Sequence, residues 1–292
     1  MASDLDSAYE VCRQIAKTEA RNFYYAFRTL PPHRRRAIHA VYAFCRICDD
    51  IVDEERPLDE KRRLLAETRD KLTWGRDGAE SDPVFIALKD AAETFAIPIP
   101  LLEEVIDGVE MDLTQNRYQS FEDLRDYCYK VASTVGLICI EIFGYSDPRA
   151  REYAVDLGLG MQLTNILRDV KEDAQIGRIY LPQDDLDSFD YPESDLVRGK
   201  VNDAFRGLMA HQVQRARTYI DSGRRLIPLV SPQARACPAV LAGVYGTILD
   251  RIKASGFDVY RERIGLRTSE KILLMAKLWL TSLIPETVPL RK

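Results

Sequence analysis

Apolar residues recur at intervals of three and four along most of the chain, which is the spacing of amphipathic α-helices. The pattern covers residues 5–29, 33–53, 58–72, 84–95, 100–114, 121–143, a segment that follows Pro148 and reaches Asp173, 195–227, 232–255 and 269–283. Residues 74–83 and 184–191 are predicted as loops, and no strand-like alternation, repeat or linker is evident. We therefore expect an all-α, single-domain helical bundle over residues 1–292, with its functional site in a central cavity.

Polar residues interrupt one apolar helix face between residues 157 and 173. A step of four residues advances about 400° along an α-helix, so Asn165, Asp169 and Asp173 form one stripe. The stripe continues the apolar positions Leu157 and Met161, which predicts that it faces inward. Unpaired buried carboxylates cost several kcal/mol, so these acids must pair, take up protons or hold a metal ion. Oxygen ligands on a rigid face suit Mg²⁺, which usually binds one or two carboxylates together with water and substrate phosphates.

A second acidic pair, Asp49 and Asp53, has the same spacing of four. It continues the apolar face of the helix predicted over 33–53, one turn beyond Cys45. One such pair alone is typical of a solvated helix end. Because both sets share the spacing and both extend an apolar stripe, we expect them to form one site for metal ions and a diphosphate.

Composition and charge narrow the classes of partner. The 292 residues carry a net charge of −5 with only 3 His, which argues against a nucleic-acid binder. A diphosphate substrate fits this acidity only if metal ions intervene. The sequence shows no signal peptide, so its 6 Cys are expected to be reduced thiols in a cytoplasmic protein. The apolar segment 272–284 is too short to span a bilayer; peripheral contact with the inner membrane face, for product release, is an open alternative.

Four motifs, in matching order over nearly the whole chain, resemble the squalene/phytoene synthase family. They are FYYAF at 23–27, DDIVD at 49–53, YCYKVASTVG at 127–136, and the segment 165–182 that ends in GRIYLP. Within the family, IDGVEMD at 106–112 and CIEIFGY at 139–145 most resemble presqualene diphosphate synthases of bacterial hopanoid pathways, and phytoene synthases carry similar strings. The resemblance implies an isoprenoid-synthase fold and head-to-head condensation of two prenyl diphosphates.

The same resemblance implies roles for individual residues. The positions that match metal ligands clamping the substrate diphosphates through Mg²⁺ are Asp49, Asp53, Asn165, Asp169 and Asp173. Those that match or flank diphosphate-binding positions are Arg46, Arg168, Arg178 and Arg263. Pocket-lining positions are matched by Tyr127, Val131, Gly136, Gln162 and Tyr245. Tyr127 or the departing diphosphate is expected to take up the proton that the reaction releases.

The implied main activity is condensation of two farnesyl diphosphates to presqualene diphosphate, with release of diphosphate and a further step to squalene where NADPH is used. A nucleotide fingerprint of the GxGxxG type is missing. Whether NADPH takes part is nevertheless left open, because some helical enzymes bind NADPH without this fingerprint. A phytoene or dehydrosqualene synthase that makes a carotenoid precursor is the alternative. Head-to-tail elongation and terpene cyclisation use similar acidic motifs, and a non-catalytic relative in protein assembly is the alternative from another class. The oligomeric state is not predicted.

Phe23 and Phe27 lie one turn apart on a predicted helix. We expect both to face a hydrophobic tunnel and Phe27 to limit the length of the prenyl chain, because a phenyl ring at the closed end of a channel fills space.

Overall fold

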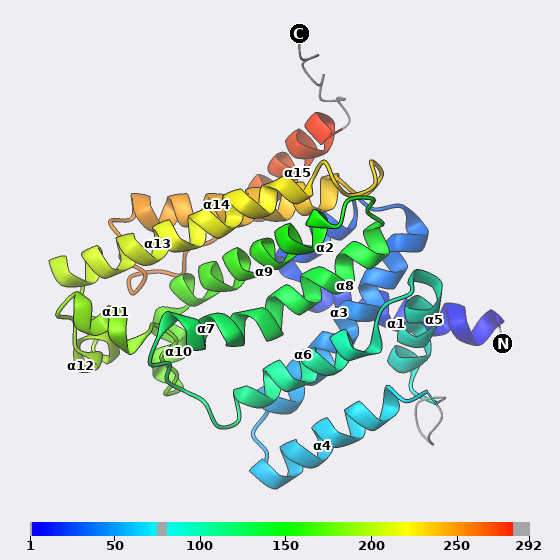
Figure 1. The fold of residues 1–292 in the computed structure, drawn as a ribbon, viewed down its shortest axis with the longest axis horizontal. Helices are drawn as coiled ribbons and strands as arrows, with labels where there is room; N and C mark the ends of the chain where they lie inside the picture. Colours follow the sequence, from blue (N-terminus) through cyan, green and yellow to red (C-terminus); the bar gives the residue numbers. More distant parts are fainter. Residues whose placement is uncertain (1, 75–80, 283–292) are drawn as a thin grey trace.

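The computed structural model describes residues 2–74 and 81–282, and this part of the chain is helical without any β-strand (Figure 1). The N-terminal helices are α1 (Ala2–Glu19), α2 (Arg21–Phe27), α3 (Pro32–Asp53), α4 (Leu58–Lys71), α5 (Pro83–Phe95) and α6 (Ile99–Met111). They are followed by α7 (Phe121–Cys128), the π-helical turn η1 (Tyr129–Ser133), α8 (Thr134–Phe143), α9 (Arg149–Arg168), α10 (Val170–Gln175), α11 (Gln183–Ser188) and α12 (Glu193–Val197). The last are α13 (Asp203–Gly223), the 3₁₀ turn η2 (Arg224–Leu226), α14 (Ala236–Ala254) and α15 (Thr268–Ser282). The predicted all-α bundle is confirmed.

Helix α3 shows how the periodic pattern becomes structure. Pro32 occupies the first turn, where its missing N–H costs nothing. One face buries small and apolar residues that include Ala37, Ala40 and Phe44 in the core. A neighbouring face carries Ile38, Val41, Tyr42, Cys45 and Asp49 at the 3, 4, 7 spacing, and these residues line a central cavity.

Several predicted helices are divided in the structure. The segment 5–29 breaks at Ala20 into α1 and α2, and 195–227 breaks after α12 at Gly199, whose positive φ of 68° suits glycine. The predicted loop 184–191 instead contains most of α11, in which Leu186 is buried. This helix is too short for periodicity to reveal it.

The segment 121–143 is continuous but changes its winding at η1. There the Thr134 N–H donates to the carbonyl of Tyr129, five residues back. The turn lies against α9, where the backbone approaches so closely that a Cβ at Gly158 would stand 2.6 Å from the Cα of Ser133. Gly136 permits a similar approach, because its Cβ would stand 2.8 Å from the carbonyl oxygen of Ala154. The close approach at Gly136 is therefore made by the backbone of α9.

The predicted helix that carries Asn165, Asp169 and Asp173 bends at Asp169, whose φ of −103° and ψ of 15° leave the helical region. The hydrogen bonds between residues four apart nevertheless continue: Asp169 N–H donates to Asn165 and Asp173 N–H donates to Asp169, both at 2.9 Å. The three side chains thus stay on successive turns across the bend between α9 and α10.

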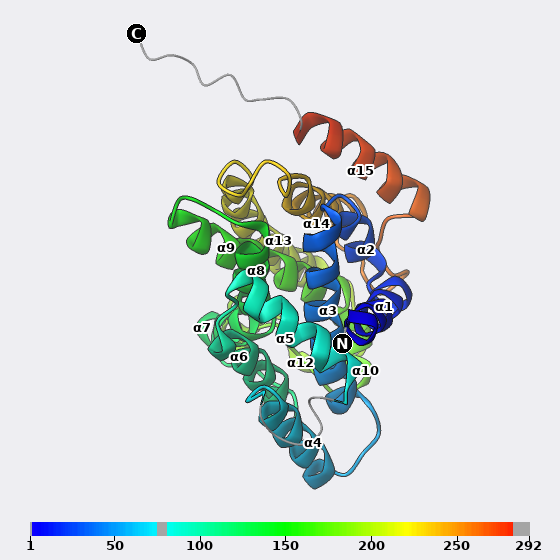
Figure 2. The same cartoon turned by 90° about the vertical axis from the view of Figure 1, so that its right-hand side faces the viewer.

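Helix α15 packs on the outside of α14 and α2 (Figure 2). Over residues 2–74 and 81–282, no helix combines the length and apolar character needed to cross a membrane. Peripheral membrane contact stays a prediction. All 6 cysteines are free thiols, as expected.

Candidate active site

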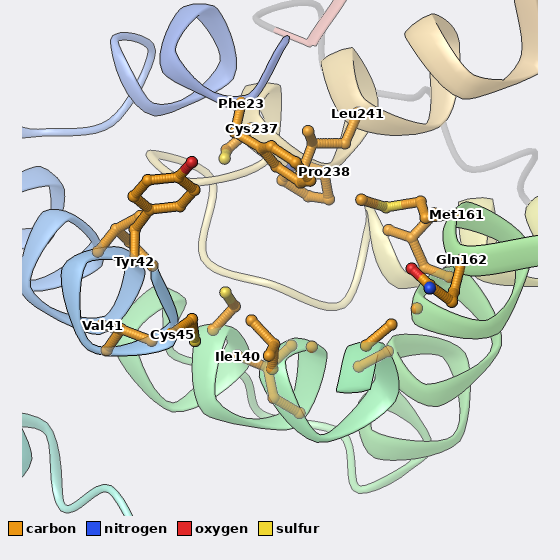
Figure 3. Close-up of a pocket in the computed structure, with 18 of the residues that line it drawn as sticks. Phe23, Val41, Tyr42, Cys45, Ile140, Met161, Gln162, Cys237, Pro238 and Leu241 are labelled. Atoms are coloured by element: carbon orange, nitrogen blue, oxygen red, sulfur yellow. The ribbon is translucent and has the colours of Figure 1, made fainter. Parts of the chain in front are cut away.

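A cavity of about 280 Å³ lies among α2, α3, η1, α8, α9, η2 and α14 (Figure 3). Its wall is mostly apolar and includes Phe23, Phe27, Ile38, Val41, Val131, Val135, Gly136, Ile140, Phe143, Leu157, Met161 and Leu241. Along α3 the lining runs from Ile38 to Asp49, which at the helical rise is about 17 Å. The cavity therefore suits an extended hydrocarbon chain.

Polar groups gather at one end of this cavity, which we call the polar end. Asp49 and Asn165 belong to its lining, with Gln162 one turn earlier on α9. Gln162 accepts a hydrogen bond from the Asn165 amide at 3.3 Å. Asp53 lies one turn beyond Asp49, and Arg178 Nη1 lies 3.8 Å from its carboxylate. Arg178 follows α10, which carries Asp173. Its contact with Asp53 therefore brings the two acidic stripes together.

Burial, and after it the repulsion between like charges, raises the pKa of two acids at the polar end. Burial, together with the charge of Asp53, raises the pKa of Asp49 to about 7, against the opposing charge of Arg46. Burial and the Asp169 carboxylate likewise raise the pKa of Asp173 to about 7, with Arg178 opposing. Both acids therefore lack enough compensating positive charge. A divalent cation would supply it.

The acids do not form a closed metal cage by themselves. In the described segments, no three His, Cys, Asp or Glu side chains converge closely enough to hold a metal ion. Mg²⁺ does not require such a cage, because it retains water and binds one or two carboxylates together with substrate phosphates. The metal-ligand assignment of Asp49, Asp53, Asn165, Asp169 and Asp173 stays a prediction.

Asp169 differs from the other acids because two arginines bind it. Arg168 Nε donates to it at 2.8 Å, and Arg263, from the segment between α14 and α15, donates at 3.0 Å. These arginines also line a second cavity of about 300 Å³ with Tyr245 and Lys271. The second cavity shares Phe23, Tyr42 and Asn165 with the first. Its charged lining consists of these two arginines, both paired with Asp169, together with Lys271 and Glu19.

Two of the predicted site residues are turned toward other partners. Arg46 pairs with Asp50 on the same helix and does not line either cavity. Tyr127 does not line them either: its hydroxyl donates to Asp112 at 3.0 Å. Tyr180 also donates to Asp112 at 3.0 Å. Sequence reasoning missed Asp112 and Tyr180 as site residues, although they stand in the strings 106–112 and 177–182 that carried the resemblance.

Phe23 and Phe27 both line the cavity, as predicted. Their ring centroids are 6.1 Å apart, and the Phe27 ring also lies 6.0 Å from that of Tyr42. Phe27 is only 5% exposed. It therefore contributes to core packing as well as to the cavity wall.

A family model described as squalene/phytoene synthase matches residues 16–270. The chain belongs to the squalene/phytoene synthase family. It is therefore a prenyltransferase of isoprenoid biosynthesis, and the recognised resemblance is confirmed. The chain is 38% identical to the 15-cis-phytoene synthase of Synechocystis, over 95% of this chain and 86% of the relative. It is also 38% identical to the phytoene synthase of Mycobacterium tuberculosis, over 94% and 91% of the two chains.

Solved structures agree on the fold. A dehydrosqualene synthase in complex with a ligand superposes with a TM-score of 0.86 at 28% identity, covering 96% of this chain and 99% of that one. The squalene synthase HpnC of Alicyclobacillus acidocaldarius gives a TM-score of 0.82 at 30% identity, covering 88% and 97%.

These comparisons correct the expected product. The prediction of a presqualene diphosphate synthase of hopanoid biosynthesis is wrong, because the similar relatives at 37–38% identity are phytoene synthases. The two strings that suggested it have other roles in the structure. Ile106 is buried in the core, Asp112 binds two tyrosines, and Cys139 is one residue among many in the cavity wall. Residues with such roles do not indicate what becomes of the intermediate that these synthases share, and they therefore do not identify the product.

Proposed function

We propose that the protein condenses two C20 prenyl diphosphates head to head to phytoene and releases diphosphate. The observation that carries the proposal is the 38% identity to phytoene synthases over nearly the whole chain. The long apolar cavity has acids at one end and adjoins a second cavity that is lined by arginines. This arrangement supports the proposal, because the substrate is a hydrocarbon chain that ends in a diphosphate.

The residues of the polar end bind and orient the diphosphates. Asp49, Asp53 and Asp173, with Asn165, would hold Mg²⁺, which supplies Lewis-acid neutralisation of the departing group. Arg168 and Arg263 offer guanidinium donors in the second cavity. Guanidinium groups bind phosphate oxygens in pairs, so they orient the diphosphate as well as attract it.

The chemistry requires that water be kept away from carbocations. Loss of diphosphate from one chain leaves an allylic cation, which the C2–C3 double bond of the second chain attacks. A proton then leaves and a cyclopropane closes. The second ionisation, rearrangement and proton loss give the polyene. The apolar wall, which includes Val41 and Phe143, excludes the water that would quench each cation.

Phytoene and dehydrosqualene both form by proton loss, whereas squalene needs a hydride. We therefore expect no requirement for NADPH. The structural similarity to a dehydrosqualene synthase favours condensation of two C15 chains as the second candidate. The two candidates differ in chain length and share the same steps.

The test is incubation of the purified protein with geranylgeranyl diphosphate and, separately, with farnesyl diphosphate. Each reaction is run with Mg²⁺ or with a chelator, with and without NADPH, and the products are identified before and after phosphatase treatment. We expect a C40 polyene from the C20 substrate, dependent on Mg²⁺ and indifferent to NADPH. A C30 polyene from the C15 substrate alone would replace the proposal by its alternative, and no product from either would refute both.

A further inference from the structure

Arg178 directly follows the glycine that ends the last turn of α10. Gly177 has a positive φ of 79°, and the Arg178 N–H donates to the carbonyl of Asp173 at 2.9 Å, as in a Schellman motif. The Arg178 side chain is 20% exposed, and its Nη1 lies 3.8 Å from the carboxylate of Asp53 on α3. Arg178 therefore contacts both acidic stripes from a loop, with its backbone on α10 and its side chain on α3.

Arg117, in the loop between α6 and α7, holds this turn with four hydrogen bonds. Its Nη1 donates to the carbonyls of Gly177 and Asn116, both at 2.7 Å. Its Nε and Nη2 donate to the two carboxylate oxygens of Glu193 at 3.0 and 2.6 Å. One guanidinium thus joins three segments: its own loop, the turn before Arg178, and the first residue of α12.

The turn is fixed on its other side by the main chain. The Ile179 N–H donates to the carbonyl of Asn116 at 3.0 Å, so the loop of Arg117 binds the residue before Arg178 and the residue after it. Helix α12, which supplies Glu193, is itself anchored by Leu196, which is buried. These contacts leave the backbone of Arg178 a single position relative to α10.

The ion pair between Arg117 and Glu193 is exposed, with 40% and 38% of the two side chains accessible. Exposed pairs of this kind contribute little to stability. Arginine nevertheless offers what this place requires, because its planar fork binds both carboxylate oxygens and still has a donor for the carbonyls. The geometry therefore fits a residue that positions a loop better than one that stabilises the fold.

We propose that Arg117 and Glu193 are positioning residues, which hold the turn of residues 177–179 so that the Arg178 guanidinium stands at Asp53, where Mg²⁺ and diphosphate are proposed to bind. This inference rests on the proposed function, which assigns the polar end to a diphosphate. A cation that is already in place loses less freedom when the ligand binds, so the clamp strengthens binding without touching the ligand. Neither Arg117 nor Glu193 lines either cavity.

The experiment measures Arg117→Lys in two ways: the Kd for inorganic diphosphate in the presence of Mg²⁺, and steady-state turnover. Lysine keeps the positive charge but has one compact ammonium group in place of the fork. We expect Kd and KM to rise by about 5- to 10-fold, on the scale of one weakened hydrogen bond to a charged group. Since the clamp acts on binding, kcat should stay within about 3-fold of the wild type.

A second background tests whether Arg117 acts through Arg178. In Arg178→Gln, the side chain that the clamp positions is gone, so adding Arg117→Lys should cause no further loss of binding. Glu193→Gln keeps the size of the side chain and one acceptor oxygen, and it should weaken binding in the same direction by a smaller factor. If Arg117→Lys does not fold, as judged by circular dichroism, Glu193→Gln takes its place in both backgrounds.

The matched control is Arg125→Lys. Arg125 forms an exposed pair with Glu122 at 3.3 Å, and this pair joins residues three apart on α7 and therefore holds no loop. The control should leave Kd, KM and kcat unchanged.

Two results would overturn the inference. Wild-type Kd and KM in a folded Arg117→Lys would show that the charge suffices without the fork, and losses that multiply in the Arg178→Gln background would show that Arg117 acts independently of Arg178. Turnover is measured on whichever of the C20 and C15 substrates the wild type converts, so a wrong chain length affects only the proposed function. If the wild type binds diphosphate but converts neither substrate, the proposed function fails and the Kd values still decide the inference. A wild type that does not bind diphosphate with Mg²⁺ would overturn both.

Discussion

Replacing Asp49 by asparagine should stabilise the free protein while removing its turnover. Burial and the nearby charge of Asp53 raise the pKa of Asp49 to about 7, which means that the folded protein disfavours its charged form. Asparagine has nearly the same shape and no charge. Groups placed for function at the expense of stability commonly show this trade-off.

The size of the effect follows from the pKa. The difference between the usual value of 3.8 and about 7 is equivalent to about 4 kcal/mol. Asp49 lines the cavity and its side chain is only half-buried by surface area, so its charge is partly screened and we expect about 1–2 kcal/mol. For a protein of this size, that is an increase in Tm of about 2–3 °C.

The gain should depend on pH in a defined direction. An unfolded chain loses the proton of this carboxyl near pH 4, whereas the folded protein keeps it until about pH 7. The folded state therefore binds the extra proton between these values, and the wild type loses stability as pH rises from 4 to 7. The advantage of Asp49→Asn is absent at pH 4 and complete at pH 8.

Thermal unfolding of both proteins at pH 4.5 and pH 8, without Mg²⁺, measures this directly. Asp6→Asn, an exposed change on α1, is the control and should have no effect at either pH. Adding Mg²⁺ with inorganic diphosphate should raise the Tm of the wild type more than that of the variant, because the variant lacks a ligand charge. A Tm gain that is absent at pH 8, or equal at both pH values, would refute the reasoning.

Three further predictions concern other parts of the site. Asp53→Asn should lower kcat by about 100-fold or more with the fold intact, since a charge aimed at the leaving group is lost; turnover near the wild-type rate would exclude Asp53 as a metal ligand. Gly136→Ala should destabilise the protein by about 1–3 kcal/mol in urea unfolding, because the new Cβ would meet Ala154 O at 2.8 Å; equal stability would contradict the close packing of α8 on α9. Phe27→Ala should raise kcat/KM for the C20 relative to the C15 substrate by removing a ring from the cavity wall, and an unchanged ratio in a folded variant would exclude Phe27 as the chain-length gate.

Local periodicity in the sequence was enough to predict the long helical segments and the two acidic stripes. Apolar residues three and four apart fall on one face of a helix whatever surrounds it, so Ile38, Val41 and Cys45 were predictable as an inward face that leads to Asp49. The same rule placed Asn165 with Asp169 and Asp173. Motif order then identified the family.

Tertiary structure decided the breaks in these helices and the pairs between distant residues. The π-helical turn at Tyr129 and the bend at Asp169 depend on how closely α9 and its neighbours pack, which local patterns do not report. Arg263 reaches Asp169 across 94 positions of sequence. No spacing rule connects residues so far apart, because their contact follows from the path of every helix between them.

The contact of Asp112 with Tyr127 and Tyr180 shows the same division at the scale of a few residues. Asp112 and Tyr180 were visible in recognisable strings, but a string does not reveal that a carboxylate will accept hydrogen bonds from two phenols on separate segments. The direction of a side chain is set by packing against its neighbours in space, whereas the identity and period of the residues are set by the chain. The sequence therefore determined which chemical groups are present and on which helices, and the fold determined which of them meet.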